Sequence, residues 1–246
     1  MDRMLYLAMN GAKQNMLAQS ANTNNLANVS TPGFRSDFAS FRSMPVFGNG
    51  HPTRVFAMAE RPGVDLNPGG LNTTGNPLDI AVDGEGYIAV QAADGSEAFT
   101  RAGNMRLTAA GVLLSGSGEP VLGAGGPISL PPSSKIEIST EGTVSVIPFG
   151  QDDNTMQEVD RVKLVNPLAR DLYKGNDGLL RLKEGGQSPA DANVRVVSGA
   201  VEMSNVNVSE ALVNMIELSR QFELHVKMMR TADKQAEKAS ELMRLS

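Results

Sequence analysis

The sequence predicts an α+β fold in which a long helix at each end of the chain brackets an all-β middle. The first observation is the distribution of helix breakers, because all 13 prolines and every glycine except Gly11 lie between Pro32 and Gly199. Both residues are costly in a helix interior. The second observation is periodicity: apolar residues recur at threes and fours in the two end segments, and alternate in short runs between them.

Residues 1–30 are predicted to form the N-terminal helix of an inner domain. Its apolar residues recur at Met1, Met4, Leu5, Ala8, Met9, Ala12, Met16 and Leu17. The alanines on this face would let a partner helix approach closely, and the Pro32-Gly33 pair stops the helix. A run of asparagines follows at Asn22, Asn24, Asn25 and Asn28. Because their side chains compete for backbone hydrogen bonds, they either tie helix to helix or fray this one.

Residues 31–75 are predicted to be an irregular, extended linker, because they contain several prolines and show little periodicity. Residues 76–203 are predicted to be an all-β outer domain. Short alternating runs there, such as 87–91, 135–139 and 194–202, are separated in several places by turns that contain glycine. That pattern is typical of an antiparallel meander or barrel.

Residues 204–246 are predicted to hold the C-terminal helix of the inner domain, which begins at Val208 after an N-cap at Asn207. Spacings that alternate between four and three give this helix a coiled-coil repeat. The repeat falls at Val208, Leu212, Met215, Ser219, Phe222, Val226, Met229, Asp233, Ala236, Ser240 and Met243. Apolar residues also lie beside this seam, so the helix is expected to need neighbours on more than one side.

The two helical ends are expected to pair as a coiled-coil-like inner domain, because each carries an apolar stripe that the β domain does not need. Burial of the C-terminal seam alone is not expected to offset the entropy of ordering that helix. The remaining apolar surface must then be covered by other copies of the chain or by other proteins. This arrangement is that of a subunit in an axial assembly.

Composition excludes several classes of function. The formal net charge is −5, charges of both signs are interspersed, and aromatic residues make up only 4% of the chain, so no nucleic-acid surface is expected. The absence of cysteine removes disulfides, thiolate catalysis and sulfur ligands for metals. No apolar run approaches the ~18 residues that span a bilayer. Neither membrane insertion nor a cleaved signal peptide is expected.

The clearest cluster of carboxylates is Asp79, Asp83 and Glu85, which lie among glycines. It lacks a histidine and the spacing of a calcium-binding loop, so turn carboxylates explain it better than a metal or acid–base site. The glycines at 116–118 and 123–126 do not complete a dinucleotide-binding fingerprint, and no nucleophile elbow is present. No enzyme activity, cofactor, metal or small-molecule substrate is expected.

Several distinctive motifs follow one another along the chain. The first is carried by Asn24, Asn25, Leu26, Ala27, Asn28, Pro32, Gly33 and Phe34. A central motif covers residues 71–87, and residues 99–104 and 118–123 follow it. The last is carried by residues 215–222 and by Ser204, Asn205, Val206 and Asn207. In this order the motifs resemble the signatures of bacterial flagellar rod and hook proteins, and residues 1–14, 33–38 and 159–167 resemble proximal rod subunits most closely.

The resemblance implies a structural subunit of the basal-body proximal rod, which polymerises through its terminal helices to build the drive shaft that transmits torque. A subunit of the distal rod or the hook is the alternative, and a secreted β-domain enzyme or glycan-binding module is the alternative from a different class. The implied partners are other copies of the chain, neighbouring rod proteins and the flagellar type III export apparatus. The implied location is the rod where it crosses the periplasm.

Inter-subunit contacts are predicted on both terminal helices. On the first helix they are Leu5, Met9, Met16 and Leu26. On the second helix they are Leu212, Met215, Ile216, Phe222, Val226 and Met229. Their expected role is to bury the apolar stripes of each subunit against its neighbours.

Overall fold

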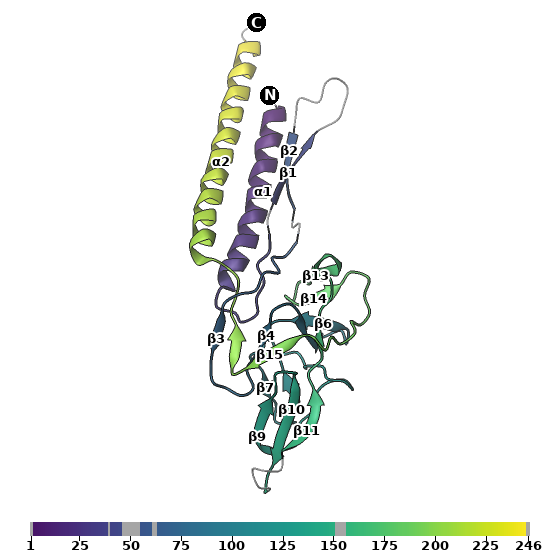
Figure 1. Ribbon diagram of the computed structural model, residues 1–246. Coiled ribbons are helices and arrows are strands. Elements are labelled where there is room, and N and C mark those ends of the chain that lie inside the picture. The colour runs from purple at the N-terminus through teal and green to yellow at the C-terminus, as the bar shows by residue number, and fades with distance from the viewer. Residues whose placement is uncertain (1, 39, 46–54, 61–62, 151–155, 245–246) are drawn as a thin grey trace. The chain divides into compact units, whose positions relative to one another are not determined.

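The computed structural model describes residues 2–38, 40–45, 55–60, 63–150 and 156–244, and the chain divides into two compact units. The helical unit comprises residues 1–27, 37–63 and 206–246, and the β unit comprises residues 28–36 and 64–205. The chain therefore passes from one unit to the other after Ala27, Ser36, Gly63 and Asn205. Figure 1 shows the elements of each unit.

Two long helices and one hairpin make up the helical unit. α1 spans Asp2–Ala27 and α2 spans Val208–Arg244, and they run side by side in opposite directions (Figure 1). β1, Ser40–Pro45, pairs in antiparallel with β2, Val55–Glu60. The hairpin packs on α1 through β2, where Nδ2 of Asn10 donates a hydrogen bond to the carbonyl of Ala57 at 2.7 Å.

The start of α2 confirms the predicted N-cap. Oδ1 of Asn207 accepts hydrogen bonds from the backbone N–H of Ser209 at 3.0 Å and of Glu210 at 3.3 Å. These bonds satisfy two of the donors that a helix leaves free in its first turn. Because neither glycine nor proline follows, α2 continues without interruption for 37 residues.

The segment 31–75 differs from the irregular linker that its prolines predicted. The hairpin of β1 and β2 lies within it, and so does β3, Leu71–Thr73. Aromatic and β-branched residues such as Phe41, Val55 and Phe56 favour strands. Proline is tolerated at a strand end, where its missing N–H disrupts little of the ladder, and Pro45 ends β1. Pro45 therefore marks a strand boundary in this segment.

The β unit is built from antiparallel strand pairs. Its largest sheet has the order β12-β5-β6-β14-β13, formed by Leu164–Val165, Tyr87–Gln91, Glu97–Thr100, Leu180–Leu182 and Leu172–Lys174. A three-stranded sheet has the order β11-β10-β9, formed by Gln157–Arg161, Thr143–Pro148 and Ser133–Ile138. The three-stranded sheet is a meander of consecutive strands, as predicted for the middle of the chain.

Three further strand pairs and one short helix complete the β unit. The pairs are β4 with β15, β3 with β16 and β7 with β8. β4 spans Ile80–Asp83 and β15 spans Arg195–Ser198. β16 spans Ala200–Glu202, β7 spans Arg106–Leu107 and β8 spans Leu113–Leu114. The 3-10 helix η1 spans Ala169–Asp171. Pairing of β4 with β15 joins strands from opposite ends of the unit's sequence.

The β unit has a hydrophobic core of its own. Ile80, Ile88 and Leu113 belong to its larger apolar cluster and are completely buried. A smaller cluster surrounds Phe99 on the five-stranded sheet, together with Tyr87. Each large buried side chain contributes about 1.5–3 kcal/mol relative to exposure. The chain is therefore an α+β protein whose β-rich middle is stabilised by burial within that middle.

Candidate functional site

The apolar residues of α1 differ in burial according to their size. Ala8, Ala18 and Ala21 are buried, whereas Met9 and Met16 on the same helix are 52% and 59% exposed. Short side chains let two helix backbones approach closely. The large apolar residues of α1 are consequently left on its outer surface.

The buried stripe of α2 agrees with the predicted seam at some positions only, and the predicted residue Val226 is among the half-buried ones. Met215, Phe222 and Met229 are half-buried, as predicted for seam residues. Between them the inner positions fall one residue earlier than predicted, at Ala211, Leu218, His225 and Ala232. Spacing alone does not locate the centre of the buried arc on a helix with apolar residues on more than one side. The predicted seam is therefore wrong at the exposed positions Val208, Leu212, Ser219, Asp233, Ala236 and Ser240, and the side chain of Met243 lies outside the described residues.

Gly11 of α1 lies directly against the imidazole of His225 on α2. A Cβ atom on residue 11 would lie 2.4 Å from Cε1 and 2.7 Å from Nε2 of His225. No side chain can occupy that space unless the imidazole moves. Gly11 is therefore a hole for the ring of His225, which explains why the one glycine of these helices stands in the middle of α1.

Two asparagine side chains of α1 bond to other segments of the helical unit, and for Asn22 the partner is the other helix, which is one of the two predicted alternatives. Nδ2 of Asn22 donates to the carbonyl of Ala211 at 2.7 Å. Asn25 makes a reciprocal pair with Asp37: its Nδ2 donates to the Asp37 carbonyl at 3.0 Å, and its Oδ1 accepts from the Asp37 N–H at 2.9 Å. The motif residue Asn25 thus fixes the point where the chain re-enters the helical unit.

Gly33 fixes the N-terminal motif inside the β unit. Its N–H donates to the carbonyl of Glu202 at 2.7 Å. Its φ is +70°, and an added Cβ would lie 2.2 Å from the backbone nitrogen of Ala102. The left-handed backbone and the close approach both require glycine. This explains why the motif needs glycine after Pro32.

Asn205 fixes the C-terminal motif in the same unit. Its Oδ1 accepts from the N–H of Ser36 at 2.9 Å, and its own N–H donates to the carbonyl of Phe34 at 3.4 Å. Its Nδ2 donates to the carbonyls of Asp65 at 2.9 Å and Asn67 at 3.1 Å. The side chain of Asn205 therefore holds two earlier segments, at Ser36 and at residues 65–67, beside the C-terminal end of the β unit.

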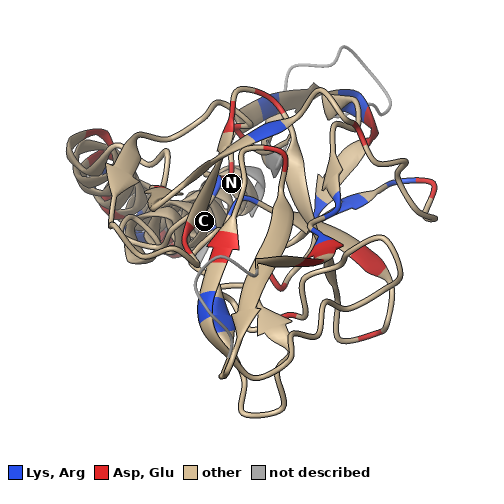
Figure 2. Cartoon of the chain, turned by 60° about the horizontal axis from the view of Figure 1, so that its bottom comes forward, with Lys and Arg blue, Asp and Glu red and all other residues tan. Residues whose placement is uncertain are grey.

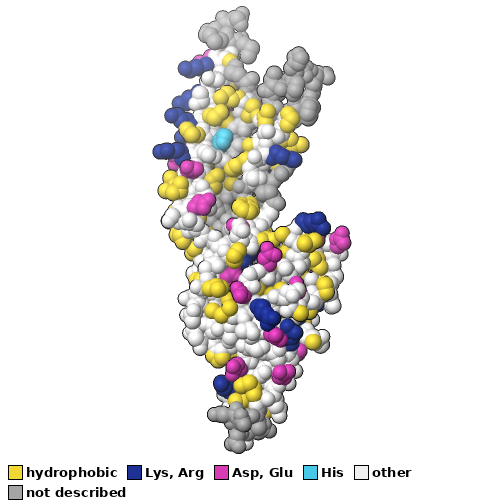
Figure 3. Space-filling view, viewed as in Figure 1, with side chains coloured by type: hydrophobic (Ala, Val, Ile, Leu, Met, Phe, Trp, Pro, Cys, Tyr) yellow, Lys and Arg dark blue, Asp and Glu magenta, His cyan; other side chains and the backbone are white. Residues whose placement is uncertain are grey.

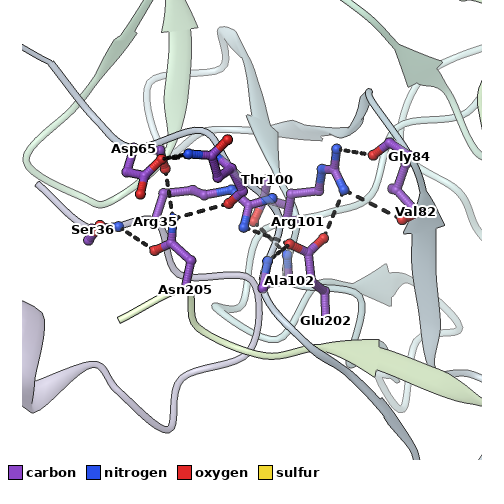
Figure 4. A network of polar contacts seen from close by, with 12 residues as sticks. Arg35, Ser36, Asp65, Val82, Gly84, Thr100, Arg101, Ala102, Glu202 and Asn205 are labelled. Carbon is purple, nitrogen blue, oxygen red and sulfur yellow. Dashed lines mark hydrogen bonds and ion pairs between the residues drawn. The ribbon is translucent and has the colours of Figure 1, made fainter. Parts of the chain in front are cut away.

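A buried glutamate lies at the centre of these contacts (Figure 4). Oε1 of Glu202 is 2.6 Å from Nη1 of Arg35, and Oε2 is 2.8 Å from Nη1 of Arg101. All three side chains are at most 4% exposed. The N–H of Gly69 also donates to Oε1 at 2.8 Å, and Nη2 of Arg101 donates to the Gly84 carbonyl at 2.7 Å. Glu202 thereby connects the N-terminal, central and C-terminal motifs within the β unit.

Tyr87 lies beside this network, with the Arg101 guanidinium 5.2 Å from its ring centre. Burial raises the pKa of Tyr87 above its ordinary value of 10.0, while Arg101 and Arg35 oppose the shift. A raised folded-state pKa contributes stability that is fully present below the unfolded value and is lost as the pH rises through the folded value.

We therefore expect one of the three tyrosines to ionise late when phenolate absorbance is followed at rising pH. Tyr87→Phe should remove that late step, because the other tyrosines, Tyr6 and Tyr173, are exposed. A late step that persists in Tyr87→Phe would contradict the assignment.

The three carboxylates considered for catalysis do not form one cluster of partners, because Asp79 bonds to the preceding turn and Asp83 ends β4. Asp79 accepts hydrogen bonds from Oγ1 of Thr74 at 2.6 Å and Nδ2 of Asn76 at 3.0 Å, whereas Asp83 and Glu85 are exposed. Within the described residues, no three or more His, Cys, Asp or Glu side chains are grouped to hold a metal ion. Figure 2 shows acidic and basic residues interspersed over the β unit. No helix in the described part of the chain has the length and apolar character to span a membrane.

The residues predicted to contact other subunits differ in exposure. Met9, Met16, Leu212 and Ile216 are exposed, and Ile216 reaches 68%. The remaining members are half-buried, namely Leu5, Leu26, Met215, Phe222, Val226 and Met229. Figure 3 shows hydrophobic side chains over the helical unit on the face in view. The exposed group is available to another chain.

Three family models match the chain. They are the flagella basal body rod protein over residues 5–35, the D1 domain of the flagellar hook protein FlgE/F/G over residues 81–146, and the C-terminal region of the flagellar basal body rod FlgEFG protein over residues 197–242. Together they define the class as rod and hook proteins of the bacterial flagellum.

Similarity to individual proteins narrows the class. The chain is 40% identical to the flagellar basal-body rod protein FlgF of Salmonella typhimurium and to that of Escherichia coli, over the full length of both chains in each case. It is 29% identical to the flagellar basal-body rod protein FlgG of Bacillus subtilis, over 94% of this chain and 95% of that relative. The chain belongs to the FlgF family of flagellar basal-body rod proteins.

Sequence reasoning missed four residues that the structure places at central positions. Arg35, Arg101 and Glu202 form the buried network, although each lies in or next to a recognised motif. A charged residue in an otherwise apolar strand was the available signal for Glu202, because β16 is buried along its whole length. His225 had no such signal, because a lone histidine on a helix is usually solvated. Its position became informative only beside Gly11.

Proposed function

We propose that this chain is a structural subunit of the proximal part of the flagellar basal-body rod and that it polymerises through its terminal helices. The observation that carries the proposal is the division of apolar residues in the helical unit. Gly11 of α1 lies against His225 of α2 and Ala8, Ala18 and Ala21 are buried, while Met9, Met16, Leu212 and Ile216 remain exposed. Burial of each such side chain against another subunit is worth about 1.5–3 kcal/mol. A helical pair with this exterior favours association with further chains.

In this proposal, α1 and α2 form a coiled-coil-like inner domain of the rod, and the β unit forms the outer domain. The inner stripe of α2, with its spacings of four and three, supports the coiled-coil description. The buried network around Glu202 gives the outer domain a fixed structure through which torque can pass. We assign no enzyme activity to either unit, because the motif residues are used in structural contacts.

The partners we propose are other copies of this chain, the neighbouring proximal rod subunits and the distal rod protein. We also propose export by the flagellar type III apparatus without cleavage, to a rod that crosses the periplasm. A distal rod subunit is the second candidate for the function. The 40% identity to FlgF relatives, compared with 29% to the FlgG relative, favours the proximal rod.

The experiment that tests this function uses Phe222→Asp in the full chain. Phe222 is half-buried on the inner stripe of α2, so a carboxylate there should disrupt the helical pair without reaching the core of the β unit. We expect complete loss of motility in a host that lacks its own copy of the gene. Limited proteolysis should still yield a resistant β unit.

The matched control is Asn214→Asp, which adds the same carboxylate at an exposed position of α2. This variant should complement motility. Motile cells that carry Phe222→Asp, with the variant incorporated in their rods, would show that the helical pair is not needed for assembly and would overturn the proposal.

A further inference from the structure

Asn10 of α1 is followed directly by Gly11. An asparagine before a glycine is prone to lose its side-chain amide, because the backbone nitrogen of the next residue can attack Cγ and glycine has no Cβ to obstruct that approach. A second pair of this kind, Asn49 and Gly50, lies outside the described residues. Among the described residues, Asn10 is the one asparagine that precedes a glycine.

Separate contacts hold each member of this pair. Nδ2 of Asn10 donates to the carbonyl of Ala57 on β2 at 2.7 Å, and Nε2 of Gln14 donates to Oδ1 of Asn10 at 3.5 Å. A Cβ atom on residue 11 would lie 2.4 Å from Cε1 of His225. The asparagine docks the hairpin and the glycine admits the imidazole, so the fold keeps a labile pair in α1.

The helical conformation protects Asn10 from this reaction. In an α-helix the N–H of Gly11 donates to the carbonyl of Leu7, four residues earlier. The attack on Cγ must first break that bond and remove the proton. Both ends of the Asn10 amide are also engaged, so the amide is held toward β2 rather than turned to the nitrogen of Gly11. Loss of the amide therefore requires that α1 unfold locally.

We propose that Asn10 is a site of spontaneous deamidation that is closed while α1 is folded and opens when α1 unfolds. The nitrogen of Gly11 bonds to Cγ of Asn10 and closes a succinimide ring. The side-chain amide nitrogen leaves as ammonia and carries the proton that Gly11 lost. Water then opens the ring, which gives aspartate when the bond to Cγ breaks and isoaspartate when the bond to the backbone carbonyl carbon breaks. The reaction needs water and no other co-reactant.

Either product disturbs α1 at this position. Aspartate replaces the Nδ2 donor with an oxygen, which faces the carbonyl oxygen of Ala57 with no proton between them. Isoaspartate adds a methylene group to the backbone, so the helical hydrogen bonds around residue 11 lose their register next to His225. A chain that stays unfolded is thereby marked by a covalent change that weakens its helical unit, whereas a folded chain keeps Asn10.

The rate of deamidation in the full chain tests this proposal. Trypsin separates the two asparagine–glycine pairs into peptides 4–13 and 43–54, and mass spectrometry follows the conversion of amide to carboxyl in each. A synthetic peptide of residues 4–13 gives the unprotected rate in the same neutral buffer, because so short a segment is not a stable helix alone. We expect Asn10 to react more slowly in the chain than in the peptide by about tenfold or more, since a packed helix opens rarely.

Guanidinium chloride supplies the matching condition, because chain and peptide should then deamidate at the same rate. Equal rates for chain and peptide in the native buffer would overturn the proposal. A synthetic peptide that does not deamidate would also overturn it.

The effect of the product is tested with Asn10→Asp in the full chain. This variant should lose its helical circular dichroism at a lower temperature than the unmodified chain. The matched control is Asn214→Asp, which makes the same change at an exposed position of α2 and should leave that temperature unchanged. If Asn10→Asp melts at the temperature of the unmodified chain, the proposed effect of deamidation on α1 is wrong.

Discussion

Replacement of Glu202 by glutamine is expected to lower the free energy of unfolding of the β unit by about 3–5 kcal/mol. The carboxylate faces two buried guanidinium groups, 2.6 Å from Arg35 and 2.8 Å from Arg101. A glutamine of the same shape leaves both cations buried without a counter-charge. Urea unfolding of the full chain, followed by protease resistance of the β unit, measures the loss.

The balance of charge in this network makes the prediction sharper. Removal of Arg35 would leave Arg101 and Glu202 as a neutral buried pair, whereas removal of Glu202 leaves two like charges. Arg35→Met should therefore destabilise the β unit less than Glu202→Gln does. The reverse order would show that hydrogen bonds, rather than charge balance, dominate the network.

An exposed ion pair provides the matched control. Nζ of Lys135 lies 3.5 Å from Oε2 of Glu137, and both side chains are more than half exposed. Exposed pairs contribute about 0–1 kcal/mol, so Glu137→Gln should change the unfolding midpoint little. An equal effect of the two glutamine substitutions would mean that burial of Glu202 does not determine its contribution.

The helices were predictable because their signals are local. The absence of glycine and proline after Asn207 and the cap formed by that residue define α2 from sequence alone. In the same way, the Pro32-Gly33 pair predicted from sequence alone that the first helix ends before residue 32. Strand β5, Tyr87–Gln91, was also predicted with its observed bounds, because its flanking glycine and its alternation lie next to each other in the chain.

Features that depend on distant residues were not predictable in this way. Residues 194–202 were expected to form one strand, but Gly199, with φ +75°, separates β15 from β16. The two strands then pair with β4 and β3, far earlier in the chain. An alternating pattern gives no information about which strand will lie beside it.

The inner stripe of α2 shows the same limit for helices. Periodicity located Met215 and Phe222 correctly, because both lie within the apolar arc of the helix. It could not identify the exact centre of that arc, which depends on the size of the residues that α1 presents. A seam that contains His225 becomes reasonable only when Gly11 is known to lie opposite it.

The contact between Gly11 and His225 leads to a prediction of comparable size for the helical unit. Gly11→Leu should separate α1 from α2 and abolish motility, because even a Cβ atom would lie 2.4 Å from the imidazole. Helix propensity alone predicts the opposite sign, since leucine is better than glycine in a helix by nearly 1 kcal/mol. Motility and the thermal loss of helical circular dichroism distinguish the two effects.

The decisive variant combines Gly11→Leu with His225→Ala, which moves the large side chain to α1 and the hole to α2. If steric fit at this point sets the register of the helices, the double variant should recover motility that Gly11→Leu alone has lost. Lys13→Leu is the matched control, because residue 13 is exposed and the new side chain is the same. In the double-mutant cycle of Gly11→Leu and His225→Ala, the interaction energy between the two substitutions should be favourable by more than about 1 kcal/mol. Residues in contact show interaction energies of about 0.5–3 kcal/mol. A double variant as defective as Gly11→Leu would mean that the helices are held in register by other contacts, such as the bond from Asn22 to the carbonyl of Ala211.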